Sequence, residues 1–393
     1  MSTKAKYLEN KDKRYCCSCR SCEKICPTNA IEMEDDLGIS YPYVNEEKCI
    51  NCGKCKSVCQ YSAEHFRYKS NIENKVYASW HKDENIVKTS SSGGLFTALS
   101  DFILKKDGVV FGASYNNNFK VSISSTIKNN RDNFKGSKYT KSDTANSYKE
   151  VKELLDSDKS VLYTGTPCQI AGLNAFLKKD YDKLICVDLI CHGMPSTLLI
   201  DKYLEHLEKQ YQSKVSSVNF RFKKYNKIPY LKIDFLNNEA HEEDFNVKDK
   251  YGHIFLSHLA MMPSCNNCLY NKITRESDIT IGDFWGIEKM NPSHANSNGT
   301  SLVIVNTQKG ARVFDDMKHD IIFFEETQNH ALEANPPLSR QCGYNPLSKS
   351  FLPYLKKHGF KKAYFKYVKI GNKLILPYRV LRKIKKSLYT KED

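Results

Sequence analysis

Cysteine residues dominate the first sixty positions of the chain, and their spacing is that of iron–sulfur ligands. Nine of the fifteen cysteines lie between Cys16 and Cys59. Four of them are spaced as Cys-x2-Cys-x2-Cys-x3-Cys and are followed by Pro27, which is the run found in bacterial ferredoxins. The same run recurs 33 residues later, so the segment contains an internal repeat. The two runs consist of Cys16, Cys19, Cys22 and Cys26, and of Cys49, Cys52, Cys55 and Cys59.

Two such runs predict two [4Fe–4S] clusters that exchange their fourth ligands. In two-cluster ferredoxins the last cysteine of each run ligates the other cluster. A structural zinc module is the alternative, but zinc sites usually use two separated Cys-x2-Cys pairs. Gln60 follows the second run where proline is usual, and Cys17 is interpreted as a neighbour that does not ligate. The expected ligand sets are Cys16, Cys19, Cys22 and Cys59, and Cys26, Cys49, Cys52 and Cys55.

Four cysteines further along the chain form a candidate third group. Cys168 and Cys191 each fall at the end of a predicted strand, where α/β sheets place their ligands. Cys265 and Cys268 form a Cys-x2-Cys pair in a loop. The four could hold a third cluster, and zinc or free thiols are the alternatives.

Small and polar residues at strand ends could hold a flavin, the usual converter between hydride pairs and single electrons. A serine- and glycine-rich turn precedes a predicted helix, where backbone N–H groups can hold a pyrophosphate. The turn lacks the G-x-G-x-x-G fingerprint, so a serine-capped helix is an equal alternative. Asp283 could bond a cofactor hydroxyl or cap a helix. No catalytic acid or base is assigned. The candidate cofactor contacts are Ser91, Ser92, Gly93, Gly94, Thr164, Gly165, Thr166 and Asp283.

After residue 70 the sequence alternates between predicted strands and predicted helices, and these elements must position the candidate residues. This alternation favours an α/β domain with a largely parallel or mixed sheet, whose strand order the sequence does not give. Cys186 is interpreted as a core residue of one strand, and Cys342 is unassigned. The predicted strands are Val76–Trp80, Val109–Ser114, Val161–Thr164, Leu184–Cys191, Tyr230–Phe235, Ile279–Ile281 and Leu302–Asn306, and the predicted helices are Leu95–Leu104 and Tyr148–Leu155.

The expected fold class is an α+β ferredoxin-like N-terminal module, then an α/β flavoprotein domain with a mixed sheet, then a basic helical tail. The boundaries follow the composition. They are a polar tail at 1–13, the two-cluster ferredoxin domain at 14–69, two parts of the flavoprotein body at 70–150 and 151–330, and the basic tail at 331–393.

Composition and charge exclude several classes of protein. Hydrophobic residues make up 40% and charged residues 27%, a globular balance. No apolar run approaches the roughly 18 residues of a spanning helix, and Met1–Arg14 lacks the apolar segment of a signal peptide, so a cytoplasmic location is expected. The net charge of +15 is concentrated in Leu355–Asp393, with thirteen basic and two acidic residues. Amphipathic Val380–Leu388 predicts peripheral contact with the anionic inner face of a membrane, with a solvated tail as the alternative. No specific nucleic-acid binding is expected.

Six segments of the body carry a family resemblance: Ser90–Leu95, Gly165–Leu173, Cys191–Ser196, Cys265–Tyr270, Asp278–Gly286 and Gly299–Asn306. Together they resemble the beta subunits of coenzyme F420 hydrogenases and dehydrogenases. The resemblance covers roughly residues 75–310, behind the ferredoxin module. It implies FAD in the α/β body, a [4Fe–4S] cluster at Cys168, Cys191, Cys265 and Cys268, and hydride exchange with a deazaflavin coenzyme or another substrate. Similar chains with a fused ferredoxin module accompany surface-polysaccharide gene sets in bacteria.

The sequence therefore predicts an iron–sulfur flavoprotein oxidoreductase that passes electrons between a hydride donor or acceptor at FAD and [4Fe–4S] clusters. The resemblance also implies a role in bacterial surface-polysaccharide biosynthesis. Its partner would be a redox protein or a small-molecule hydride donor. The alternative is an electron-delivery module without a substrate of its own, which docks to a partner enzyme.

Overall fold

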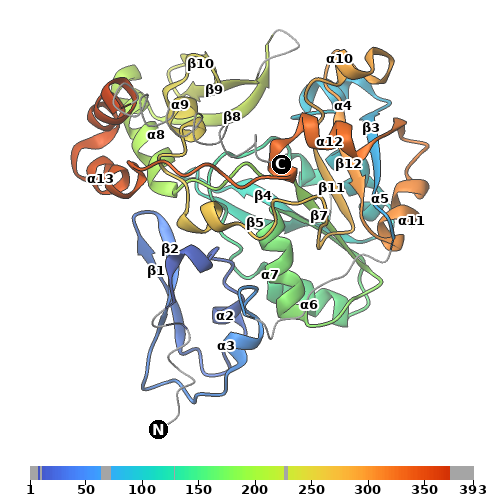
Figure 1. Ribbon diagram of the computed structural model, residues 1–393, viewed down its shortest axis with the longest axis horizontal. Coiled ribbons are helices and arrows are strands. Elements are labelled where there is room, and N and C mark those ends of the chain that lie inside the picture. Colours follow the sequence, from blue (N-terminus) through green and yellow to red (C-terminus); the bar gives the residue numbers. More distant parts are fainter. Residues whose placement is uncertain (1–7, 9–10, 63–71, 128, 225–228, 372–393) are drawn as a thin grey trace, which may run out of the picture.

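A small N-terminal module lies beside a larger body (Figure 1). The computed structural model describes residues 8, 11–62, 72–127, 129–224 and 229–371. The module consists of one antiparallel hairpin and two single-turn helices, which agrees with the predicted ferredoxin-like unit. Its elements are η1 (Lys13–Tyr15), α2 (Ser21–Lys24), β1 (Ile31–Asp36), β2 (Ile39–Val44) and α3 (Lys54–Ser57).

The 33-residue repeat of the sequence is also a repeat of the backbone. Each of the two short helices follows a residue in the left-handed region, Arg20 with φ 63° and Gly53 with φ 71°. Ser18 and Asn51, two positions earlier in each run, have φ 55° and 54°. Left-handed residues turn the chain sharply. The same turn in both runs therefore lets the cysteines of each run face a common point.

An eight-stranded mixed sheet forms the centre of the body, in the order β13-β3-β12-β11-β7-β6-β4-β5 (Figure 1). Strands β3, β11, β7, β6 and β4 share one direction, and the other three run against them. The carboxyl ends of five strands therefore meet at one edge. The strands are β3 (Lys75–His81), β4 (Val109–Tyr115), β5 (Val121–Thr126), β6 (Val161–Gly165), β7 (Leu184–Leu189), β11 (Ile279–Asp283), β12 (Ser301–Val305) and β13 (Ile321–Glu326).

Helices cover both faces of this sheet and make a three-layer body. On one face α5 and α11 pack against side chains such as Leu162 and Val303. On the other face α6 and α7 pack on Phe111 and Tyr163, and α10 and α12 pack over β3 and β12. The helices and 3-10 turns are α4 (Glu84–Thr89), α5 (Leu95–Leu104), η2 (Asn129–Phe134), α6 (Ser147–Asp156), α7 (Pro167–Leu177), η3 (Pro263–Asn267), α10 (Ile287–Met290), η4 (Pro292–His294), α11 (Gln308–Asp316), α12 (Gln328–Ala334) and η5 (Pro336–Leu338).

A third unit packs beside the sheet around its own apolar core. A three-stranded antiparallel sheet, β10-β9-β8, and three helices share a cluster that includes Tyr203, Phe220, Tyr251 and Phe351. Helices α8 and α13 lie side by side in this unit (Figure 1). The elements are α8 (Thr197–Tyr211), β8 (Val215–Lys223), β9 (Pro229–Phe235), β10 (Ala240–Asp244), α9 (Lys250–Leu256), α13 (Ser348–Tyr364) and the π-helical η6 (Phe365–Ile370).

Up to residue 371, the C-terminal part of the chain packs into the third unit, which differs from the basic tail expected from the sequence. Phe351, Leu355 and Phe360 of α13 are buried in the core of the third unit. Apolar residues recur among the lysines here, so the stretch is an amphipathic helix with a core face. The predicted amphipathic segment Val380–Leu388 lies outside the described residues. Within the described residues, no helix combines the length and apolar character needed to cross a membrane.

Asp278 directly precedes β11, and its side chain links three elements of the body. Its side chain is 2% exposed, and its oxygens accept hydrogen bonds from the Cys186 amide at 2.8 Å and the Thr307 hydroxyl at 2.7 Å. The Lys309 ammonium lies 3.7 Å away and also binds the exposed carboxylate of Asp180 at 2.9 Å. The buried carboxylate thereby joins β7 and β11 to the start of α11.

We expect Asp278→Ala to destabilise the body by about 3 kcal/mol, because it leaves a buried lysine and a buried amide without this partner. Asp180→Ala removes the exposed partner of the same Lys309 and should cost less than about 1 kcal/mol. Thermal unfolding of the two anaerobically purified variants, followed by circular dichroism, measures the difference. Equal losses in Tm would contradict the role given to Asp278.

Candidate functional site

The first predicted ligand set lies where the ferredoxin module meets the body. The Cys22 thiol interacts electrostatically with Cys16, Cys19 and Cys59 of this set, and also with Cys55 of the second set. Burial raises the pKa of Cys22 well above its ordinary value and that of Cys16 to about 11. The Lys11 ammonium donates a hydrogen bond to the Cys59 sulfur at 3.1 Å. Buried thiols beside a cation are suited to hold a metal as thiolates, because metal binding displaces the proton.

The second predicted ligand set also comes together, and it opens to solvent. Cys26 lines one cavity with Cys49, Cys52 and Cys55. The last cysteine of the first run thus joins the second run, as the exchanged arrangement requires. Cys52 is exposed and Ile50, beside it, is 63% exposed. This end of the module faces outward.

The third group gathers in a cavity between the module and the body. All four cysteines predicted for it line the same cavity, although they are far apart in the sequence. They are Cys168, Cys191, Cys265 and Cys268.

Ordinary secondary-structure rules position these four cysteines. Thr166 caps α7 in a capping box with Gln169, and Pro167 occupies the first turn, so Cys168 faces the cavity from the helix start. β7 ends two residues before Cys191. The pair Cys265 and Cys268 lies in and directly after η3.

The cavity suits a group that is ligated by thiolates and carries negative charge. Arg275 lines it with a buried guanidinium, whose Nη1 donates to the Tyr270 carbonyl at 2.7 Å and lies 3.8 Å from the buried carboxylate of Asp188. Its Nε and Nη2 atoms have no hydrogen-bond partner among the described residues. Burial raises the pKa of Cys268 to about 11, and the Arg275 charge opposes that rise. Sulfur ligands next to a buried cation match an iron–sulfur cluster.

Two further cysteines line this cavity, and the sequence did not place them there. Cys342, which the sequence left unassigned, is one of them. Cys17 is the other, although it belongs to the ferredoxin run and was expected only to neighbour its ligands. Its thiol interacts with those of Cys168 of the body and Cys19 of the first ligand set. These contacts raise the pKa of Cys17 well above its ordinary value, and the contact with Cys17 lowers that of Cys19 to about 6.

Gln60 explains why the second run departs from the ferredoxin pattern. Its side chain is buried, and Nε2 donates to the Cys17 sulfur at 3.1 Å and to the Cys168 carbonyl at 2.8 Å. Its Oε1 accepts from the Tyr270 hydroxyl at 2.5 Å. A proline at this position has no such amide. The absence of proline at position 60 was therefore a sequence signal of the contact between the ferredoxin module and the body.

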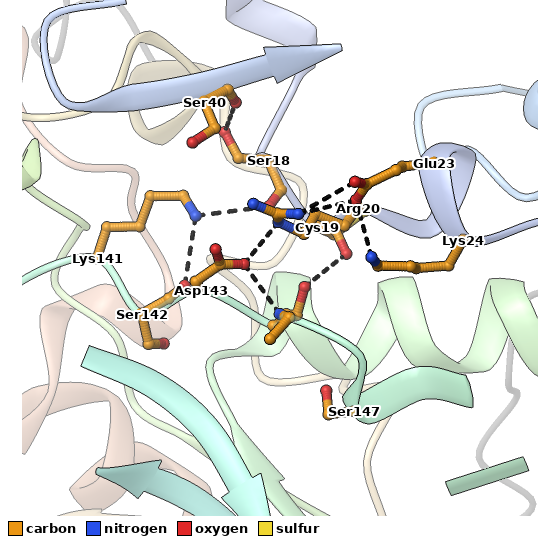
Figure 2. A network of polar contacts seen from close by, with 12 residues as sticks. Ser18, Cys19, Arg20, Glu23, Lys24, Ser40, Lys141, Ser142, Asp143 and Ser147 are labelled. Atoms are coloured by element: carbon orange, nitrogen blue, oxygen red, sulfur yellow. Dashed lines mark hydrogen bonds and ion pairs between the residues drawn. The ribbon is translucent and has the colours of Figure 1, made fainter. Parts of the chain in front are cut away.

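A polar network fastens the ferredoxin loop to the body, as Figure 2 shows. Arg20 pairs with Asp143 at 2.6 Å, and the Thr144 hydroxyl donates to the Cys19 carbonyl at 3.0 Å. Lys141 is buried and donates to the Ser18 carbonyl at 3.5 Å. The network holds the loop against the residues that precede α6.

The serine–glycine turn predicted to contact a flavin lies at the carboxyl edge of the sheet. The Ser91 hydroxyl accepts from the Ser137 amide at 2.9 Å, and the Ser92 hydroxyl donates to the Thr300 carbonyl at 2.9 Å. Gly93 lies so close to the sheet that a Cβ there would meet the Ser79 carbonyl at 2.5 Å. Both hydroxyls are thus bonded within the chain. An anion here would be held through backbone N–H groups at the start of α5.

The other predicted flavin contacts lie at the same edge of the sheet. The Thr164 hydroxyl donates to the Phe111 carbonyl at 2.8 Å, and Thr166, after Gly165, caps α7. Asp283 ends β11 and pairs with Arg221 at 2.8 Å.

Arg221 joins the two groups and was missed by the sequence analysis. Its guanidinium also donates to the Ser91 carbonyl at 2.7 Å and lies 5.4 Å from the centre of the Trp285 ring. Asp283 therefore binds an arginine and does not cap a helix. No motif marks Arg221, because it comes from β8 of the third unit.

Paired substitutions can test the exchanged ligand sets. Cys26→Ala with Cys52→Ala should remove about four irons, because both residues belong to one set. Cys22→Ala with Cys52→Ala, which touches both sets, should remove about eight. Iron and sulfide analysis of anaerobically purified protein measures both. Equal losses in the two double variants would overturn the exchanged arrangement.

Two family models match separate parts of the chain. Residues 15–63 match the 4Fe–4S dicluster domain, which supports two [4Fe–4S] clusters, and residues 158–329 match the C terminus of the coenzyme F420 hydrogenase/dehydrogenase beta subunit. The chain is 20% identical over 324 residues to an F(420)H(2) dehydrogenase subunit of Methanosarcina mazei, covering 79% of this chain and 84% of that protein. It is 41% identical over 47 residues to an uncharacterized ferredoxin of Methanocaldococcus jannaschii, covering 12% of this chain and 26% of that protein.

One similar solved structure is a chain of the F420-reducing [NiFe] hydrogenase complex from Methanosarcina barkeri, studied by xenon derivatization. It has 16% identity and a TM-score of 0.45, and the match covers 75% of this chain and 94% of that one. One segment of the chain is therefore similar to the 4Fe–4S dicluster domain, and another to the C terminus of coenzyme F420 hydrogenase/dehydrogenase beta subunits.

Proposed function

We propose that this iron–sulfur electron-transfer protein is a flavoprotein oxidoreductase that exchanges hydride at FAD and single electrons at three [4Fe–4S] clusters. The observation that carries the proposal is the cavity that gathers Cys168, Cys191, Cys265 and Cys268 directly against the ferredoxin loop. The clusters would supply one-electron transfer, and a bound FAD would supply the exchange between hydride and single electrons.

The residues of the chain divide this work by position. Cys168 and Cys191 of the third group follow the carboxyl ends of β6 and β7. The second set, with exposed Cys52, faces outward at the far end of the module. Exposed Ile50 and the basic residues Lys48 and Lys54 flank it. This end suits a redox partner protein, and the Methanosarcina mazei relative is itself named as one subunit of a dehydrogenase.

The family resemblance and the topology are what support the proposal that FAD binds at the sheet edge. Asp283 ends β11, two strands from Gly165 or about 10 Å at the usual strand spacing. The serine–glycine turn lies against β12 and β3, one and two strands farther away. At this edge the start of α5 offers backbone N–H groups to an anion. Arg221 fixes the position of the turn by binding the Ser91 carbonyl. A deazaflavin coenzyme or another hydride carrier is the substrate class that the resemblance favours, and a role in surface-polysaccharide biosynthesis is carried over from it in the same way.

The second candidate is an electron-delivery module without a flavin. One observation favours it: the predicted flavin contacts Ser91, Ser92, Thr164 and Asp283 already bond to other groups of the chain. A chain that has lost the flavin would still keep the cysteine cavity.

Composition of the purified protein separates the two candidates. We expect about one FAD and about twelve irons per chain after strictly anaerobic purification. About twelve irons without flavin would favour the delivery module, and about eight irons would remove the third cluster from both proposals.

A matched pair of variants tests the third group itself. Cys191→Ala should lose about four irons. Cys186→Ala is the control, because this thiol is buried in β7 beside Asn174 and does not line the cavity. Cys186→Ala should keep the wild-type iron content. Wild-type iron in Cys191→Ala would contradict the ligand assignment.

A further inference from the structure

A buried ion pair lies at the body cavity, and one of its two members lines that cavity. Arg275 and Asp188 are 3.8 Å apart, and their side chains are 2% and 0% exposed. Asp188 belongs to β7, and Arg275 lies in the segment that leads into β11, the strand that pairs with β7. Because water does not reach either charge, both act on their surroundings more strongly than surface charges do.

The guanidinium of Arg275 has one occupied side and one side without a partner. Nη1 donates to the Tyr270 carbonyl at 2.7 Å and is the nitrogen that faces Asp188. Nε and Nη2 are buried and have no hydrogen-bond partner among the described residues. These two N–H groups form one edge of the planar group and can donate to two acceptors at once. A buried donor without an acceptor is unfavourable, so this edge points to an acceptor that the described side chains do not supply.

The cavity itself indicates what that acceptor is. Arg275 shares the cavity with Cys168, Cys191, Cys265 and Cys268. Among the described residues that line it, Arg275 is the only lysine or arginine, and no aspartate or glutamate is present. An iron–sulfur group with four thiolate ligands carries negative charge, and its sulfur atoms accept hydrogen bonds. Such a group matches both the charge and the free donor edge of the guanidinium.

We propose that Arg275 sets the reduction potential of the body cluster, with part of its charge offset by Asp188. The inference deepens the proposed function and rests on it, because it requires a cluster at the body cysteines. The step concerned is a one-electron reduction of that cluster by a cluster of the ferredoxin module, in which no bond forms or breaks and no proton moves. Arg275 favours the reduced state, because that state carries one more negative charge.

The sign of each substitution follows from the charge that it removes. Arg275→Gln removes the cation, so the body potential should fall, by about tenfold in the reduction equilibrium or about 59 mV for one electron. Asp188→Asn removes the anion that offsets this cation, so the potential should rise. Arg275→Lys keeps the charge but loses the planar donor edge, so its potential should lie between those of the wild type and Arg275→Gln.

A second buried ion pair of the body supplies a matched control. Lys309 and Asp278 lie 3.7 Å apart, and their side chains are 9% and 2% exposed. Neither residue lines the body cavity. Lys309→Gln therefore removes a similarly buried cation from outside the cavity and should leave the body potential unchanged.

The experiment is an anaerobic redox titration of the full-length protein, followed by electron paramagnetic resonance. The signal of the body cluster is the one that disappears in Cys191→Ala, and iron is counted in every sample. Circular dichroism shows whether each variant is folded. If Arg275→Gln does not fold, Arg275→Lys and Asp188→Asn still give the two signs. A lower body potential on substitution of Arg275 and a higher one in Asp188→Asn, both with wild-type iron, support the inference.

Four results would overturn it, and failure of the proposed function looks different from all of them. With about twelve irons present, the first is an unchanged body potential in Arg275→Gln or Asp188→Asn, and the second is a shift of the same sign in both. The third is a shift in Lys309→Gln as large as that in Arg275→Gln, which would make the effect one of general destabilisation. The fourth is a loss of about four irons in Arg275→Gln, which would make Arg275 a requirement for assembly. About eight irons in the wild type would instead remove the body cluster, and with it the proposed function.

Discussion

The ferredoxin loop reaches the body cysteines because α7 presents a glycine at the point of closest approach. Any side chain at Gly172 would meet Cys19, 2.9 Å away at its Cβ and 3.2 Å away at its sulfur. With only hydrogen there, the loop settles on the helix and the Ser21 hydroxyl binds the Gly172 carbonyl. The positions of Cys17 and Gln60 follow from this contact. Without it the cysteines of the module and those of the body would be two separate sites.

Buried charge at the junction also acts in favour of metal binding. Bringing thiolates together in a site that excludes water is unfavourable unless cations compensate their negative charge. Lys11 binds the Cys59 sulfur, Lys141 is buried beside the loop, and Arg275 lines the body cavity. The pKa of Lys141 is lowered by burial, while Asp143 and the nearby thiols oppose that change. The cations and the sulfur ligands therefore depend on each other.

The mixed sheet explains how chemistry from distant parts of the chain shares one edge. Five strands point the same way, so the turns after β3, β6, β7 and β11 all emerge on the same side. The body cysteines Cys168 and Cys191 follow β6 and β7, and Asp283 ends β11. β8 of the third unit then adds Arg221, which joins Asp283 to the serine–glycine turn. This order keeps the strand ends that precede Cys168 and Cys191 next to the end of β11 at Asp283.

The sequence by itself predicted the two ferredoxin ligand sets, because three thiols separated by two residues each need only a local turn to face one point. It also predicted seven strands and two helices, one of them with the exact bounds of α5, since these follow from local periodicity. Only the tertiary structure decided that Cys17 faces the body, that Gln60 bridges to it, and that residues 348–371 are core helices. The contacts of Arg221 with Asp283 and the serine–glycine turn were likewise found only in the tertiary structure. These features depend on strand order and on contacts between distant segments, and a local pattern carries no information about either.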